Sequence, residues 1–478
     1  MSFNYLPLYK HQEAGMQHVI ANNGKGALFH EVGCGKTRTA IEIYKHYKGL
    51  DNSLKMLVIC PVGLIDWAWG VEGIPKWSDF SWCNLRGKYK DADIYLINFE
   101  GISVSKKKRL EIEQLLSKHQ NWMCVIDESS KMKNFKSLIT QTLLSMREKF
   151  KIRVIMSGTP APNLEDEYWG QMQFLGNVFS SDCRKGSYHK FKNCYFHLEQ
   201  RGKVFNQGQI ISRIQMQEMF KRGVKYAIDD KSREMLIKRM QPWAHWAYKK
   251  DCLDLPDQVD EIRVVYLSPE QRKLYKTMER DCFLELQKSE VVATTALTKV
   301  MKLRQITSGF SRDTENRDVL LPSNAKLKEL MQVLDELGRK QAIIWFCFNA
   351  DMDMLKAKLN PEQYSQLDGR VNVTDRPEEI RKFVEGETQY LLAKPASAGH
   401  GLTLVNCDTE IFYSLDYSFE NYKQAKGRTH RPGQNNTCVY IHLLAQDTID
   451  ETVYKVLGGK GKKEDFVIDF LQKARGRI

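Results

Sequence analysis

The feature that most constrains this chain is a glycine-rich loop between an apolar run and a helix-like segment. The run Gly26 to Phe29 indicates a buried strand, and the loop His30-Glu-Val-Gly-Cys-Gly-Lys-Thr37 follows it. A loop in this context is typical of phosphate sites, because its glycines permit the backbone angles that turn amides toward a phosphate. The sequence therefore predicts a nucleotide-binding domain.

The loop also supplies side chains for the chemistry. Gly33 and Gly35 provide the unusual backbone angles, Lys36 can reach the terminal phosphates, and the Thr37 hydroxyl can ligate Mg²⁺ at a helix N-terminus. His30 stands where the general pattern has its first glycine. We expect ATP and Mg²⁺ as the ligands.

Strand-like runs that alternate with polar, helix-like segments occur in two regions and predict parallel sheets covered by helices. The first region has Gly26 to Phe29, Met56 to Cys60, Ile94 to Ile97, Met123 to Ile126 and Val154 to Met156. The second has Gln341 to Phe348, Tyr390 to Ala393, Thr409 to Tyr413 and Val439 to Leu444. The predicted fold class is α/β, with two lobes at 1–176 and 256–457, a basic insertion or linker at 177–255, and a basic tail at 458–478.

Positive charge is concentrated between the two regions. Lys plus Arg number 72 against 59 Asp plus Glu, and residues 183–250 contain 16 basic and 5 acidic residues, which accounts for 11 of the 13 net positive charges. Such a surface suits a phosphate backbone, because neutralising phosphates releases counterions. The candidate nucleic-acid contacts are Lys185, Lys190, Lys192 and Arg201. A merely solvated basic segment is the alternative.

Composition excludes other classes. No apolar run approaches the roughly 20 residues that a membrane-spanning helix needs, and no basic leader precedes an apolar stretch at the start. The 11 cysteines lack any Cys-x-x-Cys pair, which indicates reduced thiols. We expect a cytoplasmic protein without a membrane partner. Zinc is not expected at Cys183, His189, Cys194 and His197, because tighter ligand pairs are missing and aromatic residues surround them.

Two acidic residues follow the apolar run Met123 to Ile126. Asp127 would hold Mg²⁺ through water, and Glu128 would orient and deprotonate the attacking water. A strand-end Asp-Glu alone is more often an ordinary helix start. Its position after a phosphate loop favours catalysis.

A third candidate element lies in the second region. Gln424, Arg428 and Arg431 are spaced i, i+4 and i+7, so on a helix they would share one face. Arginines so placed can stabilise charge on a transferred phosphoryl group. The alternative is a solvated basic helix turn.

Several further segments follow one another in order. They are Tyr9-Lys-His-Gln12, Leu57-Val-Ile-Cys-Pro61 with Trp67 and Trp77, Ile97-Asn-Phe-Glu100, Asp127 to Asn134, Ser157-Gly-Thr159-Pro, Lys250 to Pro256, Leu303-Arg304-Gln305, Ser397 to Leu402, and Gln424 to Gln434. With them the chain resembles the Swi/Snf-type ATPases of helicase superfamily two, in particular compact phage and bacterial members.

The resemblance implies two RecA-like lobes with ATP between them and nucleic acid across them. Gln12 would read the adenine, Gln424 would also contact the nucleotide, and Ser157 and Thr159 would couple hydrolysis to movement. The family typically tracks along double-stranded DNA without separating the strands, so a translocase is the preferred function.

Two departures and two alternatives accompany this hypothesis. Ser130 replaces the usual His of the acidic motif, so its coupling hydrogen bonds should be weaker or made differently, and Lys394-Pro-Ala replaces a glycine-rich run. A helicase that separates strands or processes branched or single-stranded DNA is the first alternative. A basic nucleic-acid-binding module with a vestigial ATPase is the second, although Lys36, Glu128 and Arg431 are intact. No motif specifies a protein partner.

Overall fold

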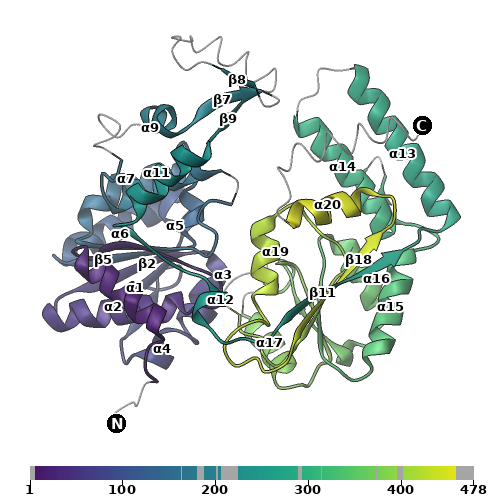
Figure 1. Ribbon diagram of the computed structural model, residues 1–478. Coiled ribbons are helices and arrows are strands. Elements are labelled where there is room, and N and C mark those ends of the chain that lie inside the picture. Colours follow the sequence, from purple (N-terminus) through teal and green to yellow (C-terminus); the bar gives the residue numbers. More distant parts are fainter. Residues whose placement is uncertain are drawn as a thin grey trace. The chain divides into compact units, whose positions relative to one another are not determined.

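A computed structural model describes residues 6–162, 164–179, 188–200, 203–205, 224–288, 293–313, 315–372, 374–395 and 402–458. The chain divides into two compact units between Leu253 and Asp254. Each unit is built around a parallel β-sheet with helices on it (Figure 1).

Unit 1 contains a seven-stranded parallel sheet in the order β10-β1-β6-β5-β2-β4-β3. Its strands are β1 (Lys25–His30), β2 (Lys55–Cys60), β3 (Trp82–Asn84), β4 (Ile94–Asn98), β5 (Trp122–Asp127), β6 (Ile152–Met156) and β10 (Ala244–Ala247). The five strands predicted for this region are confirmed, and β3 and β10 are additional.

Both faces of this sheet are buried, which explains why its strands are continuously apolar. Met56 and Val58 pack in one core with residues of α1 (Lys10–Ala21) and α2 (Lys36–Leu50). Leu57 and Ile59 point to the opposite face, into a core shared with α7 (Leu138–Met146) and α8 (Tyr168–Leu175).

Unit 1 has further described elements. They are α3 (Val62–Leu64), η1 (Ile65–Trp69), α4 (Ile74–Trp77), α5 (Phe99–Ser103), α6 (Lys106–Lys118), η2 (Ser129–Met132), η3 (Arg147–Lys149), η4 (Glu165–Glu167), α9 (Tyr188–Tyr195), α11 (Asp230–Met240) and α12 (Lys249–Cys252). A small antiparallel sheet has the order β8-β7-β9, with β7 (His197–Gln200), β8 (Lys203–Phe205) and β9 (Lys225–Ala227).

The described part of the basic segment is continuous with unit 1. β10 pairs with β1, with Ala244 opposite Ala27, and so forms an edge strand of the unit 1 sheet. Phe191 of α9 and Met240 of α11 are fully buried in the core of the same unit. The described part of the segment therefore folds with unit 1, because its buried apolar residues complete that core.

Lys192 was predicted to contact nucleic acid, but its side chain is buried in the structure. Its side chain is 6% exposed, its Nζ lies 2.7 Å from Asp166 Oδ2, and it stands 3.9 Å from the ring centroid of Tyr226. Tyr188 donates a hydrogen bond to the same carboxylate. Burial lowers the pKa of Lys192, and Asp166 opposes that shift. The ammonium group therefore holds α9 to unit 1 instead of facing solvent.

Of the other predicted nucleic-acid contacts in the segment, only one belongs to the described residues. Lys190 is exposed on α9, while Lys185 and Arg201 lie outside the described residues. The same holds for Cys183 among the zinc candidates. Within the described ranges, no group of three or more His, Cys, Asp or Glu side chains could hold a metal ion.

Unit 2 contains a six-stranded parallel sheet in the order β11-β18-β17-β14-β16-β15. Its strands are β11 (Gln258–Val265), β14 (Ala342–Trp345), β15 (Tyr364–Leu367), β16 (Tyr390–Ala393), β17 (Thr409–Phe412) and β18 (Cys438–Ala445). All four runs predicted here are strands, and with both parallel sheets the α/β fold class is confirmed.

The helices of unit 2 are α13 (Pro269–Lys288), α14 (Ala293–Ser308), α15 (Ala325–Leu337), α16 (Asn349–Lys356), η5 (Pro361–Gln363), α17 (Arg376–Val384), α19 (Phe419–Lys426) and α20 (Ile449–Leu457). A two-stranded hairpin joins β12 (Phe310–Arg312) and β13 (Asp318–Leu320). None of the described helices of either unit combines the length and the apolar character that crossing a membrane requires.

Replacing Lys192 with Met should destabilise unit 1 by about 3 kcal/mol, because it leaves the Asp166 carboxylate without its buried cation. The measurement is chemical unfolding followed by tryptophan fluorescence. Lys190→Met on the same helix is the matched control and should change the free energy of unfolding by less than about 0.5 kcal/mol. Equal effects of the two variants would contradict the buried ion pair.

Candidate nucleotide site

The glycine loop of unit 1 connects β1 to α2 and depends on two left-handed residues. Gly33 has φ 94° and Gly35 has φ 75°, angles that side chains with a Cβ rarely adopt. A Cβ on Gly35 would also collide with the Gln12 side-chain amide. The positive φ therefore favours glycine at position 35, and the Gln12 side chain of α1 approaches this position closely.

Lys36 is held inside this loop. Its Nζ donates to the carbonyl oxygens of His30 at 2.9 Å and Glu31 at 3.4 Å. Thr37 follows in the first turn of α2, where unpaired backbone amides and the helix dipole favour an anion. The ammonium group and the helix N-terminus thus offer positive charge at one end of β1.

Gln12 belongs to α1, contacts the same loop and is almost fully buried. Its Nε2 donates to the Gly35 carbonyl at 3.4 Å, and its Oε1 accepts from the Tyr9 amide at 3.0 Å. The neighbouring His11 ring hydrogen-bonds the Cys34 carbonyl at 2.9 Å. The first turn of α1 is therefore fastened to the loop by side-chain contacts.

Asp127 ends β5 beside the loop and is 5% exposed. Trp69 Nε1 donates to its Oδ2 at 3.0 Å, and the Glu128 amide donates to its Oδ1 at 3.1 Å. Burial raises the pKa of Asp127, while the charge of Lys36 and these hydrogen bonds act to lower it. A cation and two donors therefore offset part of the cost of burying this carboxylate.

Glu128 adopts an unusual backbone conformation, with φ 58° and ψ 56°. A non-glycine residue in the left-handed region carries strain that the surroundings must maintain, and such residues cluster at functional sites. Ser157 Oγ donates to Glu128 Oε2 at 3.4 Å, and the Thr159 amide donates to Ser157 Oγ at 3.1 Å. The Ser-Gly-Thr segment therefore contacts the glutamate that the sequence singled out.

These segments come together because parallel strands end on one edge of the sheet. In the register, Leu28 of β1 and Asp127 of β5 both lie opposite Met156 of β6. A Cβ on Gly158 would lie only 2.9 Å from the Val32 side chain, so the segment after β6 packs directly on the glycine loop. Ligands of open parallel sheets bind at this carboxyl edge.

The arginine motif of unit 2 differs from its predicted geometry. Helix α19 ends at Lys426, where Gly427 follows and the Arg428 amide turns back to the Ala425 carbonyl at 2.8 Å. Only Gln424 is helical, so the prediction of one shared helix face is wrong. The glycine ends the helix before either arginine.

Each residue of the motif nevertheless has a defined place. Arg428 is 2% exposed and donates to the Leu402 carbonyl at 3.4 Å. Arg431 donates to the Gly427 carbonyl at 2.5 Å and to Thr403 Oγ1 at 3.1 Å. Gln424 is buried, and its Oε1 accepts no hydrogen bond among the described residues.

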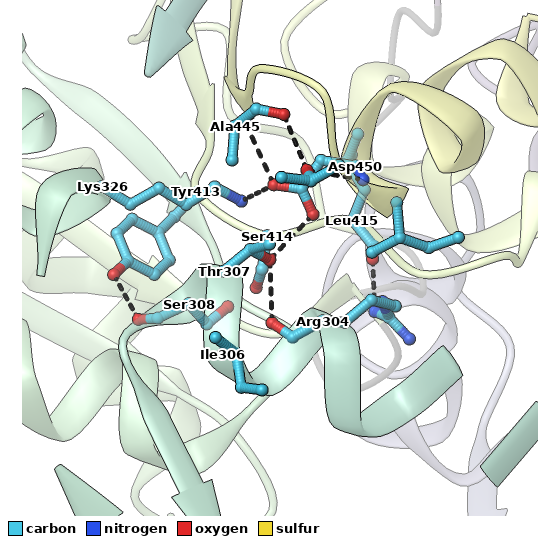
Figure 2. A network of polar contacts seen from close by, with 12 residues as sticks. Arg304, Ile306, Thr307, Ser308, Lys326, Tyr413, Ser414, Leu415, Ala445 and Asp450 are labelled. Carbon is cyan, nitrogen blue, oxygen red and sulfur yellow. Dashed lines mark hydrogen bonds and ion pairs between the residues drawn. The ribbon is translucent and has the colours of Figure 1, made fainter. Parts of the chain in front are cut away.

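The Leu303-Arg304-Gln305 segment lies at a polar network inside unit 2, which Figure 2 shows. Asp450 is its centre, accepting from Thr307 Oγ1 at 3.0 Å and pairing with Lys326 Nζ at 2.6 Å. Arg304 donates to the Leu415 carbonyl. The network connects α14, α15 and α20, which gives this segment a structural function in unit 2.

Sequence reasoning missed several side chains of the nucleotide site. Trp69 holds Asp127, and the Glu31 carboxylate accepts from the Lys249 amide at 3.1 Å, which fixes α12 to the glycine loop. Neither contact has a local signal, because the partners are 58 and 218 residues apart in the chain.

His30 forms another contact that the sequence did not reveal. Its fully buried ring shares a hydrogen bond of 2.9 Å with His245 of β10. A Cβ on Gly15 would lie only 2.9 Å from the same ring. Burial, followed by the nearby charges of His245, Lys36 and His11, lowers the pKa of His30 to about 2, and burial also lowers the pKa of His245. The pair is therefore neutral in the folded protein.

Comparison with known families and proteins matches both units. The SNF2-related domain matches residues 11–310, which include the nucleotide site from Gln12 to Thr159, and the helicase conserved C-terminal domain matches residues 325–433. These matches confirm the predicted resemblance.

Individual relatives differ in length. Protein p41 of Acyrthosiphon pisum secondary endosymbiont phage 1 is 24% identical, with 96% of this chain and 98% of p41 covered. Nuclear protein STH1/NPS1 of Saccharomyces cerevisiae is 25% identical over 93% of this chain, which spans only 34% of that protein. Among solved structures, the Sulfolobus solfataricus SWI2/SNF2 ATPase core in complex with dsDNA is 21% identical, with a TM-score of 0.42 and coverage of 98% of this chain and 93% of that chain.

Because the buried histidine pair is neutral, we expect the free energy of unfolding to fall in acid. An unfolded chain binds a proton at His30 below its ordinary pKa of 6.5, whereas the folded chain does not until about pH 2, so the free energy of unfolding falls as the pH falls below 6.5. The loss should approach about 1.4 kcal/mol per pH unit for this one group. Chemical unfolding at neutral and mildly acidic pH measures it.

Replacing His30 and His245 together with Phe keeps two rings and should flatten this pH dependence. His46→Phe, at an exposed position of α2, is the control and should keep the wild-type dependence. An unchanged slope in the paired variant would show that the buried pair is not its source.

Proposed function

The chain belongs to the SNF2-related family and is an ATP hydrolase, and from that premise we propose that it couples ATP hydrolysis to movement along double-stranded DNA. The observation that carries the proposal is the convergence of Lys36, Asp127, Glu128 and Ser157 at the carboxyl edge of the unit 1 sheet. These residues come from three separate segments and supply the groups that phosphoryl transfer requires.

Each residue receives one task. Lys36 binds the terminal phosphates by leaving the loop carbonyls that now accept its hydrogen bonds. Glu128 orients the attacking water and accepts its proton, and the contact with Ser157 fixes its carboxylate. Gln12, Gly33 and Gly35 complete the nucleotide site, with Gln12 reading the base beside the first turn of α1.

The residues present fit Mg²⁺. Thr37 and Asp127 offer hydroxyl and carboxylate oxygens, the ligand types this ion prefers. Each Asp127 oxygen accepts one hydrogen bond from the protein and keeps a further lone pair. When bound with ATP, the ion would neutralise charge on the phosphates. Trp69 and the Glu128 amide hold the carboxylate in position for it.

Unit 2 supplies the remaining groups in this proposal. Arg428 and Arg431 stabilise charge on the transferred phosphoryl group, and Gln424 contacts the nucleotide through its buried amide. Backbone carbonyls of Leu402 and Gly427 orient the two guanidinium groups. Their planar, permanently charged heads suit this task better than lysine would.

Double-stranded DNA is the proposed partner, and the basic segment of unit 1 supports it. Lys190 is exposed on α9, and we retain it with Lys185 and Arg201 as proposed phosphate contacts. Ser157 and Thr159 would couple the nucleotide site to this movement. A strand-separating helicase is the competing function within the same family, and a vestigial ATPase is disfavoured by the complete set of catalytic side chains.

Steady-state ATP hydrolysis should be stimulated chiefly by blunt duplex DNA, and less by single-stranded DNA or RNA, at one fixed salt concentration. Glu128→Gln should abolish turnover while ATP binding remains, because the amide cannot accept the proton from water. Stimulation chiefly by single strands would favour the strand-separating alternative. Normal turnover by Glu128→Gln would remove Glu128 from its proposed role.

A further inference from the structure

A buried amide joins the acidic segment to the segment after β6. Gln171 of α8 is completely buried, and Ser129 Oγ donates to its Oε1 at 2.7 Å. Its Nε2 donates to the carbonyl oxygens of Pro160 at 2.6 Å and Glu167 at 3.0 Å. The acceptor and both donor positions of the amide are therefore used.

Two of the hydrogen-bond partners of Gln171, Ser129 and Pro160, lie next to residues of the nucleotide site. Ser129 directly follows Glu128, and Pro160 directly follows Thr159. Because Ser157 Oγ donates to Glu128 Oε2 at 3.4 Å, the contacts close into a ring. The ring runs from Glu128 through Ser129 and Gln171 to Pro160, and back along the chain to Ser157.

The approach of α8 is close enough to make this ring. A Cβ on Gly170 would collide with the Met132 carbonyl of η2, so the helix backbone rests on the segment that follows Glu128. Gln171 is the next residue along the helix and reaches Ser129 directly.

We propose that Gln171 is a positioning residue that maintains the left-handed conformation of Glu128 and hence the direction of its carboxylate. A strained backbone angle persists only where several contacts determine it, and the Glu128 φ of 58° has this ring beside it. The amide acts through Ser129 and Pro160 and touches no reacting atom. This inference rests on the proposed role of Glu128 in hydrolysis.

The first test compares Gln171→Met with Gln173→Met. Met keeps the volume but makes none of the three hydrogen bonds, so kcat for ATP should fall by about 10- to 100-fold without a comparable change in KM, since the phosphate contacts stay in place. Gln173 is buried in the same helix, and its Nε2 has no partner among the described residues. Its variant should keep the wild-type kcat, and equal kcat values for the two variants would overturn the proposal.

Gln171→Glu separates positioning from packing. When protonated, this carboxyl can accept from Ser129 and donate to Pro160, but when ionised it has no donor. Burial raises the pKa of a carboxyl group, so the kcat of this variant should rise toward wild type as the pH falls. A kcat ratio to wild type that is independent of pH would contradict the role of the donated hydrogen bond.

Ser129→Ala keeps the proposal testable if Gln171→Met does not fold. It removes one hydrogen bond of the ring and should also lower kcat, and combined with Gln171→Met it should cost less than the product of the two single effects. An unchanged kcat in Ser129→Ala overturns the inference. The Glu128→Gln variant distinguishes failure of the proposed function from failure of the inference about Gln171. Normal turnover in Glu128→Gln refutes the proposed function. An inactive Glu128→Gln together with a normal Ser129→Ala refutes only the positioning role of Gln171.

Discussion

The buried carboxylate of Asp127 sets the conditions that the rest of the nucleotide site must satisfy. A charge with 5% exposure is stable only with partners, and here they are the Lys36 charge, the Trp69 indole and the Glu128 amide. Lys36 requires the glycine loop at the end of β1. The parallel register of the strands then places the catalytic glutamate proposed here beside the Ser157 hydroxyl.

Strained and buried polar groups lie around the Asp127 carboxylate. The left-handed Glu128 is held from one side by Ser157 and is followed by Ser129, which the Gln171 amide holds. That the coupling hydrogen bonds near Ser130 are weaker or made differently stays a prediction, and the neighbouring Ser129 donates to Gln171. The neutral His30–His245 pair connects the start of the glycine loop to β10.

Local patterns were sufficient for the central strands of both sheets and for the loop. The strand at Met56 to Cys60 is apolar on both faces, and the loop before Lys36 has its glycines where positive φ is needed, so both could be read from neighbouring residues. Contacts between distant residues could not. The helix expected through Arg431 ends before Gly427. Lys192 is buried in an ion pair with Asp166, and β10 pairs with β1 in the first sheet. These outcomes depend on partners that no spacing rule identifies.

Displacement of a third strand from a triplex measures whether the protein moves along double-stranded DNA. The DNA carries the triplex beside a duplex tract on which the protein can load, and release of the third strand is followed over time. If the protein moves along duplex DNA, release should require ATP, leave the underlying duplex paired, and be lost in Glu128→Gln. Duplex-stimulated ATP hydrolysis without release of the third strand, or release together with separation of the duplex strands, would contradict it.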